Sequence, residues 1–160
     1  MRAAVVDTNV LIVANEASDH ATPECIIASI DALSALRRSG IVALDDQFLI
    51  LDEYRRLVSL EGQPGVGDAF LRYLYDNLYN DAGCRLVTIT ATENDSFAEF
   101  PVDERLARFD RDDRKFVAVA VGCEPTAEVF NATDTDWWHH RVALEENGVQ
   151  VRFLCPELMR

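Results

Sequence analysis

The sequence predicts an α/β domain in which helices flank both faces of a central, mainly parallel sheet. Short apolar segments that suit buried strands alternate with longer segments whose apolar residues recur at helical spacing. The chain has 160 residues, which fits one domain spanning 1–160, and 49% of them are hydrophobic, enough to form a buried core. Neither an internal repeat nor a low-complexity tract divides it.

The first half of the chain predicts two strands and four helical segments. Residues 3–6 form an apolar run that stops at Asp7, which suits a buried parallel strand, and a helix begins within 10–14. Between positions 23 and 38 apolar residues recur at helical spacing, with a proline near the start and a glycine after the end. The remaining elements are a strand at 41–44 and helices at 47–60 and 67–79.

The second half is less regular. Residues 85–90 are rich in β-branched side chains and predict a strand, whereas 92–111 is polar, acidic and irregular. Residues 116–121 are apolar on every side, so periodicity does not separate a buried helix from a buried strand, although their valines favour a strand. The last expected elements are a strand at 128–132, a helix at 137–147 and a strand at 149–154.

Charge and cysteine spacing limit the possible environments. The chain carries 15 Lys and Arg against 28 Asp and Glu, a formal net charge of −13, which taken alone disfavours long-range attraction to nucleic acid or to an anionic membrane. No CxxC pair and no histidine at zinc-ligand spacing accompany the cysteines. We therefore expect reduced, mostly structural thiols in a cytoplasmic protein without a signal peptide or membrane-spanning segment. The cysteines are Cys25, Cys84, Cys123 and Cys155.

Four acidic residues stand where they could meet in one site. Asp7 and Asp134 come just after two predicted strands, and open α/β sheets bind ligands at the carboxyl ends of their strands. Glu53 shares the apolar stripe of its predicted helix, and Asp113 precedes the most apolar segment of the chain. Clustered carboxylates repel one another, and Mg²⁺ or Mn²⁺ prefers oxygen ligands, so a divalent cation would hold them together.

Each of these acids also has a plainer explanation. Asp7 and Asp134 suit turn or helix-capping positions, and Asp113, like its neighbour Asp112, suits the start of a helix. Glu53 fits a solvated position at the edge of its stripe equally well. The residues alone leave these alternatives open.

The order and context of the acids resemble those of a known family. The segments are Val-Val-Asp-Thr-Asn at 5–9, Leu-Asp-Glu-Tyr at 51–54, Asp-Arg-Lys-Phe-Val at 113–117 and Ala-Thr-Asp-Thr-Asp at 132–136. The chain is similar over essentially its whole length to the PIN-domain nucleases, which include the VapC-like toxins of bacterial toxin–antitoxin systems.

The resemblance implies a single PIN-like α/β domain in which residues 113–122 form a helix. It implies a metal-dependent endoribonuclease that uses Mg²⁺ or Mn²⁺ to hydrolyse RNA phosphodiester bonds. The residues that match the family's metal-binding acids are Asp7, Glu53, Asp113 and Asp134, with Asp136 as a further member. Those that match its supporting polar positions are Thr8, Asn9 and Thr133.

Positive charge for an RNA backbone would come from Arg55, Arg56, Arg114 and Lys115, for which salt bridges to surface acids are the alternative role. The resemblance further implies RNA as the substrate and a homo-oligomer as the assembly. It also implies an antitoxin protein as a partner if the chain is a toxin rather than a stand-alone RNA-processing nuclease.

Two other functions remain as alternatives, and the sequence differs from the family pattern in two places. A haloacid-dehalogenase-like phosphatase needs a second Asp where this chain has Asn9, whereas a PIN-fold module that only binds RNA or protein needs no complete acidic set. The departures are the long acidic segment 92–111 and the sequence Trp-Trp-His-His at 137–140. The tryptophans suit core packing or stacking on a base, and the histidines suit surface or structural positions.

Overall fold

A five-stranded, all-parallel sheet forms the centre of the computed structural model, which describes residues 2–160. The strand order is β3-β2-β1-β4-β5, so β1 lies in the middle and pairs with β4 in the register Val5 to Val129. The fold class predicted from the sequence is confirmed. The strands are β1 (Ala4–Val6), β2 (Val42–Asp45), β3 (Cys84–Val87), β4 (Glu128–Asn131) and β5 (Val151–Phe153).

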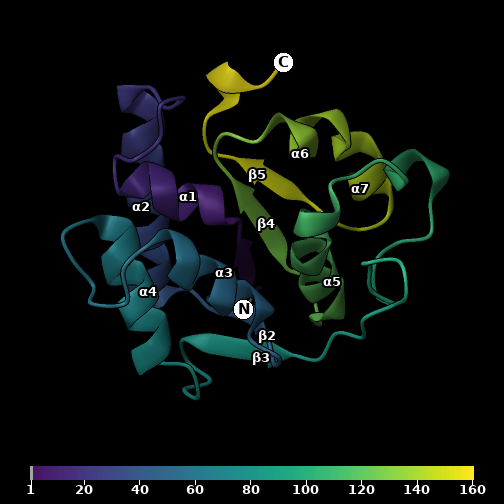
Figure 1. Cartoon of the computed structure of the whole chain (residues 1–160), viewed down its shortest axis with the longest axis horizontal. Coiled ribbons are helices and arrows are strands. Elements are labelled where there is room, and N and C mark those ends of the chain that lie inside the picture. The colour runs from purple at the N-terminus through teal and green to yellow at the C-terminus, as the bar shows by residue number, and fades with distance from the viewer. Residues whose placement is uncertain (1) are drawn as a thin grey trace.

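Helices cover both faces of this sheet, with α2 and α4 on one side of the strands and α5 and α7 on the other (Figure 1). The helices are α1 (Thr8–Ala14), α2 (Pro23–Ser39), α3 (Leu49–Leu57), α4 (Val66–Asp76), α5 (Arg114–Gly122), α6 (Thr135–His139) and α7 (Arg141–Glu146). Three short 3-10 turns accompany them, η1 (Glu104–Leu106), η2 (Arg111–Asp113) and η3 (Pro156–Leu158). Across residues 2–160, no helix combines the length and apolarity needed to cross a membrane.

The ambiguous segment 116–121 is helical, as the resemblance implies and against its β-propensity. It forms most of α5, which packs against β1, β2 and β4. Phe116, Val117 and Val119 are fully buried, and this burial on all sides accounts for a valine-rich helix. The predicted helix 137–147 is interrupted at His140, which separates α6 from α7.

The segment predicted as irregular contains a hairpin, which we call the 90–98 hairpin. Ala91 and Phe97 form an antiparallel bridge, and backbone hydrogen bonds join Thr92 N to Ser96 O at 2.9 Å and Ala98 N to Thr90 O at 2.8 Å. Asp95 sits in the turn with φ of 54°, a left-handed conformation that Asp and Asn tolerate better than most residues. The rest of 99–110 has only η1 as regular structure.

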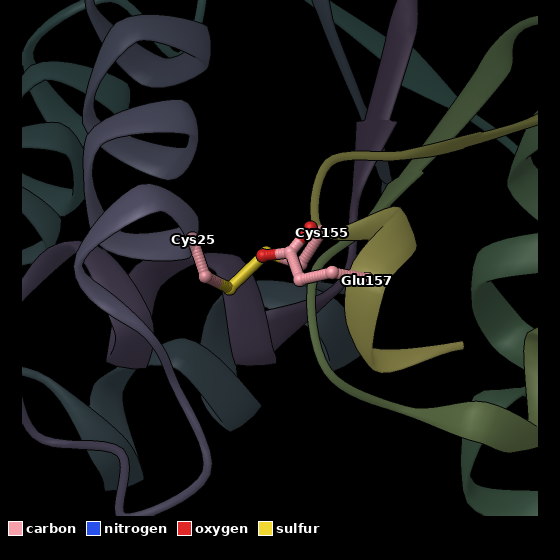
Figure 2. Close-up of side chains that lie close together, drawn as sticks. All are labelled: Cys25, Cys155 and Glu157. Carbon is pink, nitrogen blue, oxygen red and sulfur yellow. A yellow bond between two sulfur atoms is a disulfide. The ribbon is translucent and has the colours of Figure 1, made fainter. Parts of the chain in front are cut away.

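The expectation of reduced thiols is wrong for two of the four cysteines. Cys25, near the start of α2, forms a disulfide with Cys155, just before η3, with Glu157 beside the bond (Figure 2). The two cysteines lie 130 positions apart, so their spacing gave no sign of a pair that only the tertiary fold creates. Cys84 and Cys123 are buried free thiols, as expected.

Candidate metal centre

Three carboxylates from distant parts of the chain meet at the carboxyl edge of the sheet. Asp7 directly follows β1, Asp134 follows the neighbouring parallel strand β4, and Asp113 ends η2 where α5 begins. One carboxylate oxygen of each residue lies within 4.8 Å of one from each of the others. We call these three residues the carboxylate triad.

Two hydrogen bonds fix the carboxylate of Asp7, which is almost completely buried. One carboxylate oxygen caps α1 by accepting the backbone N–H of Asn9 at 3.0 Å, and the other accepts the indole N–H of Trp137 at 2.7 Å. Burial raises the pKa of Asp7 to about 7, and the nearby charges of Asp134 and Glu53 add to the effect while the two hydrogen bonds oppose it.

The pKa of Asp113 is raised further than that of Asp7. Burial, together with the charges of Asp7 and Asp134, raises its pKa to about 9. Within residues 2–160, no lysine, arginine or histidine forms an ion pair with any member of the triad. Three converging oxygen donors without a countercharge are the donor set that a hard divalent cation such as Mg²⁺ or Mn²⁺ fits.

A pair of asparagine side chains fixes the loop that carries Asp134. The Asn131 side chain donates to the Asp134 carbonyl at 3.0 Å and accepts from the Asp134 N–H at 3.3 Å. Asn9 donates to the same Asn131 oxygen at 2.8 Å, and its own oxygen accepts the Ala132 N–H at 2.8 Å. Asn9 therefore supports the site as expected, by tying the segment after β1 to the segment after β4.

Glu53 points inward but lies beside the triad rather than within it. One of its carboxylate oxygens accepts a hydrogen bond from the Thr8 hydroxyl, and the other pairs with the Lys115 ammonium group at 2.8 Å. The exposed fractions of the two paired side chains are only 16% and 12%, so this ion pair is largely shielded from water. Lys115 also donates to the Asp112 carbonyl.

Two expected site residues have contacts elsewhere. Asp136 accepts the Asp110 N–H at 2.9 Å and lies 3.2 Å from the His140 ring nitrogen, so its carboxylate does not join the triad. Arg114 is buried, with its guanidinium over the Phe100 ring at 4.6 Å and hydrogen-bonded to the backbone carbonyls of residues 106, 107 and 109. We therefore assign Arg114 a structural role in place of the substrate contact expected from sequence.

Two further predicted residues have no hydrogen bond to the triad. Thr133 is half-buried and makes no side-chain hydrogen bond within residues 2–160. Arg55 is exposed, and its guanidinium lies 5.9 Å from the centre of the Tyr75 ring.

Sequence reasoning missed several residues that build the site. Asn131 ends an apolar strand, where a buried amide is unusual, and the Tyr54 hydroxyl donates to the carbonyl of Val6 at the end of β1. Asp45 is fully buried and accepts the backbone N–H groups of Leu49 and Ile50 at the start of α3, the helix that carries Glu53. The sequence pattern that could have identified Asp45 is an acid directly after a short apolar strand, the same pattern as at Asp7.

The triad gives a pH dependence of stability with a definite sign. The pKa values of Asp7 and Asp113 lie above the ordinary 3.8, so from about pH 4 upward the folded protein keeps protons that the unfolded chain has lost. Without metal, the free energy of unfolding should therefore fall as pH rises through about 7 for Asp7 and about 9 for Asp113. Each unit of pKa shift corresponds to about 1.4 kcal/mol, so the loss should reach several kcal/mol.

Urea unfolding in EDTA between about pH 5 and 9 measures this loss. Saturating Mg²⁺ should reduce or reverse it, because the bound cation requires the deprotonated carboxylates. Asp113→Asn should remove the part of the loss above about pH 7, since only the Asp113 pKa lies that high. Stability that increases with pH in EDTA over this range would contradict the assignment.

Comparisons with known protein families, with curated protein sequences and with solved structures gave no match to this chain. A function for this chain is therefore inferred from its fold, from the contacts of the carboxylate triad and from the sequence. The resemblance in the acidic segments stays an expectation drawn from sequence.

Proposed function

We propose that the protein is a metal-dependent endoribonuclease of the PIN type. The observation that carries the proposal is the carboxylate triad, three converging buried or half-buried acids that lack a countercharge. RNA as the substrate rests on the resemblance of the acidic segments to PIN-domain nucleases. The elevated pKa values of Asp7 and Asp113 support the metal part of the proposal, since perturbed acids gather at functional sites.

Asp7, Asp113 and Asp134 would hold the metal. Bound Mg²⁺ or Mn²⁺ supplies Lewis-acid stabilisation of the phosphoryl oxygens and lowers the pKa of a bound water. Asp7 is oriented for this role by Asn9 and Trp137, and Asp134 by the hydrogen bonds of its loop to Asn131. These partners fix the carboxylates before substrate arrives, so little reorganisation is needed on binding.

Glu53 and Lys115 have separate roles in the proposal. Glu53 lies beside the triad with each carboxylate oxygen already accepting one hydrogen bond, and each oxygen keeps a further lone pair with which to orient the attacking water. Lys115 pairs with Glu53 and places a positive charge next to the site. That charge offsets part of the repulsion between a substrate phosphate and the surrounding acids.

An RNA substrate is compatible with the cytoplasmic location expected from sequence, although persistent disulfides are rare in reducing compartments. The two bonded cysteines, Cys25 and Cys155, are fully buried. A reductant therefore reaches the disulfide only when the C-terminal segment opens. The net charge of −13 predicts weak non-specific binding of RNA, and hence selection of particular sites or delivery by a basic partner.

The test is hydrolysis of a mixed panel of RNAs by the purified protein in Mg²⁺ or Mn²⁺. We expect cleavage that EDTA abolishes, that added metal restores and that Asp7→Asn removes, because Asp7 is a central ligand in the proposal. Asp31→Asn is the matched control, since Asp31 is exposed on α2. Activity that survives both EDTA and Asp7→Asn would place catalysis elsewhere, and a wild-type protein that binds but never cuts RNA would favour the non-catalytic module.

Glu53→Gln separates a role in catalysis from a role in metal binding. We expect kcat to fall about 100-fold or more, because a positioned general base contributes at least that much. The rise in melting temperature on adding Mn²⁺ should persist, because the triad is intact. Glu61→Gln, an exposed Glu beyond α3, is the control. Loss of the Mn²⁺-induced shift in Glu53→Gln would make Glu53 a direct ligand instead.

A further inference from the structure

A cleft opens beside the candidate metal centre, between α3, the 90–98 hairpin and the start of α5. Its volume is about 400 Å³, which lies within the range of small-molecule binding sites. Its lining includes Gln47, Asp52, Arg56, Asp95, Phe97 and Asp112. The hairpin wall belongs to the acidic segment by which the chain departs from the PIN pattern.

The hairpin wall is fixed to the residues on either side of Asp113. Arg111 donates to the backbone carbonyl of Asn94, and Arg114 donates to the Ser96 hydroxyl at 3.2 Å. Both arginines belong to the short stretch that presents Asp113 to the triad. The position of the hairpin is therefore coupled to that of a metal-binding carboxylate.

Lys115 connects the cleft with the triad. Its side chain lines the cleft, and its ammonium group pairs with Glu53 at 2.8 Å. Glu53 in turn accepts from Thr8, the residue after Asp7. A ligand that contacts Lys115 in the cleft would thus lie one side chain away from Glu53.

The cleft offers several hydrogen-bond acceptors. Asp52, Asp95 and Asp112 form no ion pair within the described residues, and Gln47 donates its amide to Ile89 O, which leaves its own oxygen as an acceptor. Among the cations that line the cleft, Lys115 pairs with Glu53 and Arg111 donates to the Asn94 carbonyl, so the exposed Arg56 is the one that makes no hydrogen bond or ion pair within the described residues. The partly exposed ring of Phe97 adds an aromatic surface.

We propose that this cleft binds a nucleobase adjacent to the scissile phosphate and selects amino-bearing bases over uracil. The proposal rests on the nuclease function above. The three carboxylates repel phosphates, so a base would contact them while the backbone stays near the cations Arg56, Arg111 and Lys115 of the same lining. Cytosine, adenine and guanine present amino donors to these acceptors, whereas uracil offers two carbonyl acceptors and one N–H.

The test measures binding without cleavage. Fluorescein-labelled single-stranded hexamers of cytidine, adenosine and uridine are titrated by anisotropy against Asp113→Asn protein in Mg²⁺, which is inactive under the proposal. We expect the cytidine and adenosine hexamers to bind about tenfold more tightly than the uridine hexamer, since one good base contact is worth about that factor. Adding Asp52→Asn and Asp95→Asn should reduce the preference to about twofold or less, because amides also donate.

Matched variants show whether the effect belongs to the cleft. Asp19→Asn with Asp31→Asn removes the same charge from exposed positions outside the cleft and should leave the preference unchanged. Arg56→Ala should weaken binding of all three hexamers, whereas Arg38→Ala, an exposed arginine of α2, should not. Asn tolerates the left-handed backbone at position 95, so the hairpin should survive the substitution.

Three results would overturn the cleft proposal. They are a uridine hexamer that binds as tightly as the others, a preference that persists after both cleft substitutions, and no binding of any hexamer. Failure of the nuclease function looks different, because the base preference would then be present while wild-type protein leaves every RNA intact in Mg²⁺ and Mn²⁺.

Discussion

Asp113→Asn should lower the rate of RNA cleavage by about a thousandfold or more while making the metal-free protein more stable above neutral pH. The activity falls because a ligand of the proposed metal is lost, and metal stabilisation of transition-state charge is worth several kcal/mol. The stability rises because folded wild-type protein must either keep a proton on Asp113 that the unfolded chain has lost or place a negative charge next to Asp7 and Asp134, and an amide avoids both. Opposite signs for activity and stability distinguish a metal ligand from a structural acid.

The measurements are initial rates on an RNA that wild-type protein cuts, and melting temperatures at about pH 8 with EDTA or Mn²⁺. The variant should melt at a higher temperature than wild type in EDTA and should lose most of the Mn²⁺-induced rise. Asp31→Asn, at an exposed position of α2, should behave as wild type in every measurement. A variant that is less stable in EDTA yet still responds fully to Mn²⁺ would show that Asp113 is a structural acid and not a metal ligand.

Removing the Cys25–Cys155 disulfide should produce the largest change in stability. The bond spans 130 positions, and in the chain-entropy treatment a closed loop of that length stabilises the folded state by about 5 kcal/mol. For a domain of this size the melting temperature should fall by about 10–20 °C. The comparison is thermal unfolding of wild-type protein and of Cys25→Ser with Cys155→Ser, each with and without a dithiol reductant.

The reductant itself provides the control. It should lower the melting temperature of wild-type protein to near that of the double serine variant, and it should leave the variant unchanged. Cys84 and Cys123 are buried thiols without a partner, so they should not contribute. A wild-type melting temperature that equals that of the double serine variant and does not change with the reductant would mean that the two sulfurs are not bonded in solution.

The sequence predicted the sheet and the triad because both follow from local rules. An apolar run that stops at an acid marks a buried strand with a carboxylate at its end, and β1 and β4 lie next to each other, so Asp7 and Asp134 meet. Asp113 was a candidate because it precedes the most apolar segment of the chain, and the resemblance was needed to predict that segment as a helix, since its residues are apolar on all sides. The inward direction of Glu53 followed from its place on the apolar stripe of α3.

The features that sequence did not predict depend on contacts between distant segments. Arg114 was expected at the substrate, but carbonyl groups of the loop before it and the Phe100 ring surround its guanidinium. Asp136 follows Asp134 by two positions, and the start of α6 turns it toward Asp110 and His140 instead of the triad. No pattern of spacing in one chain reveals such partners, because each is set by how two loops pack.

The Cys25–Cys155 bond closes a covalent ring that contains the exposed turn of the 90–98 hairpin. A protease that nicks this turn between Asn94 and Asp95 would produce two polypeptides, 1–94 and 95–160, which the bond still joins. Asp7 and Glu53 would lie on the first and Asp113 and Asp134 on the second. The nicked protein would migrate as one species on a non-reducing gel, and reduction would divide the candidate metal centre between two fragments.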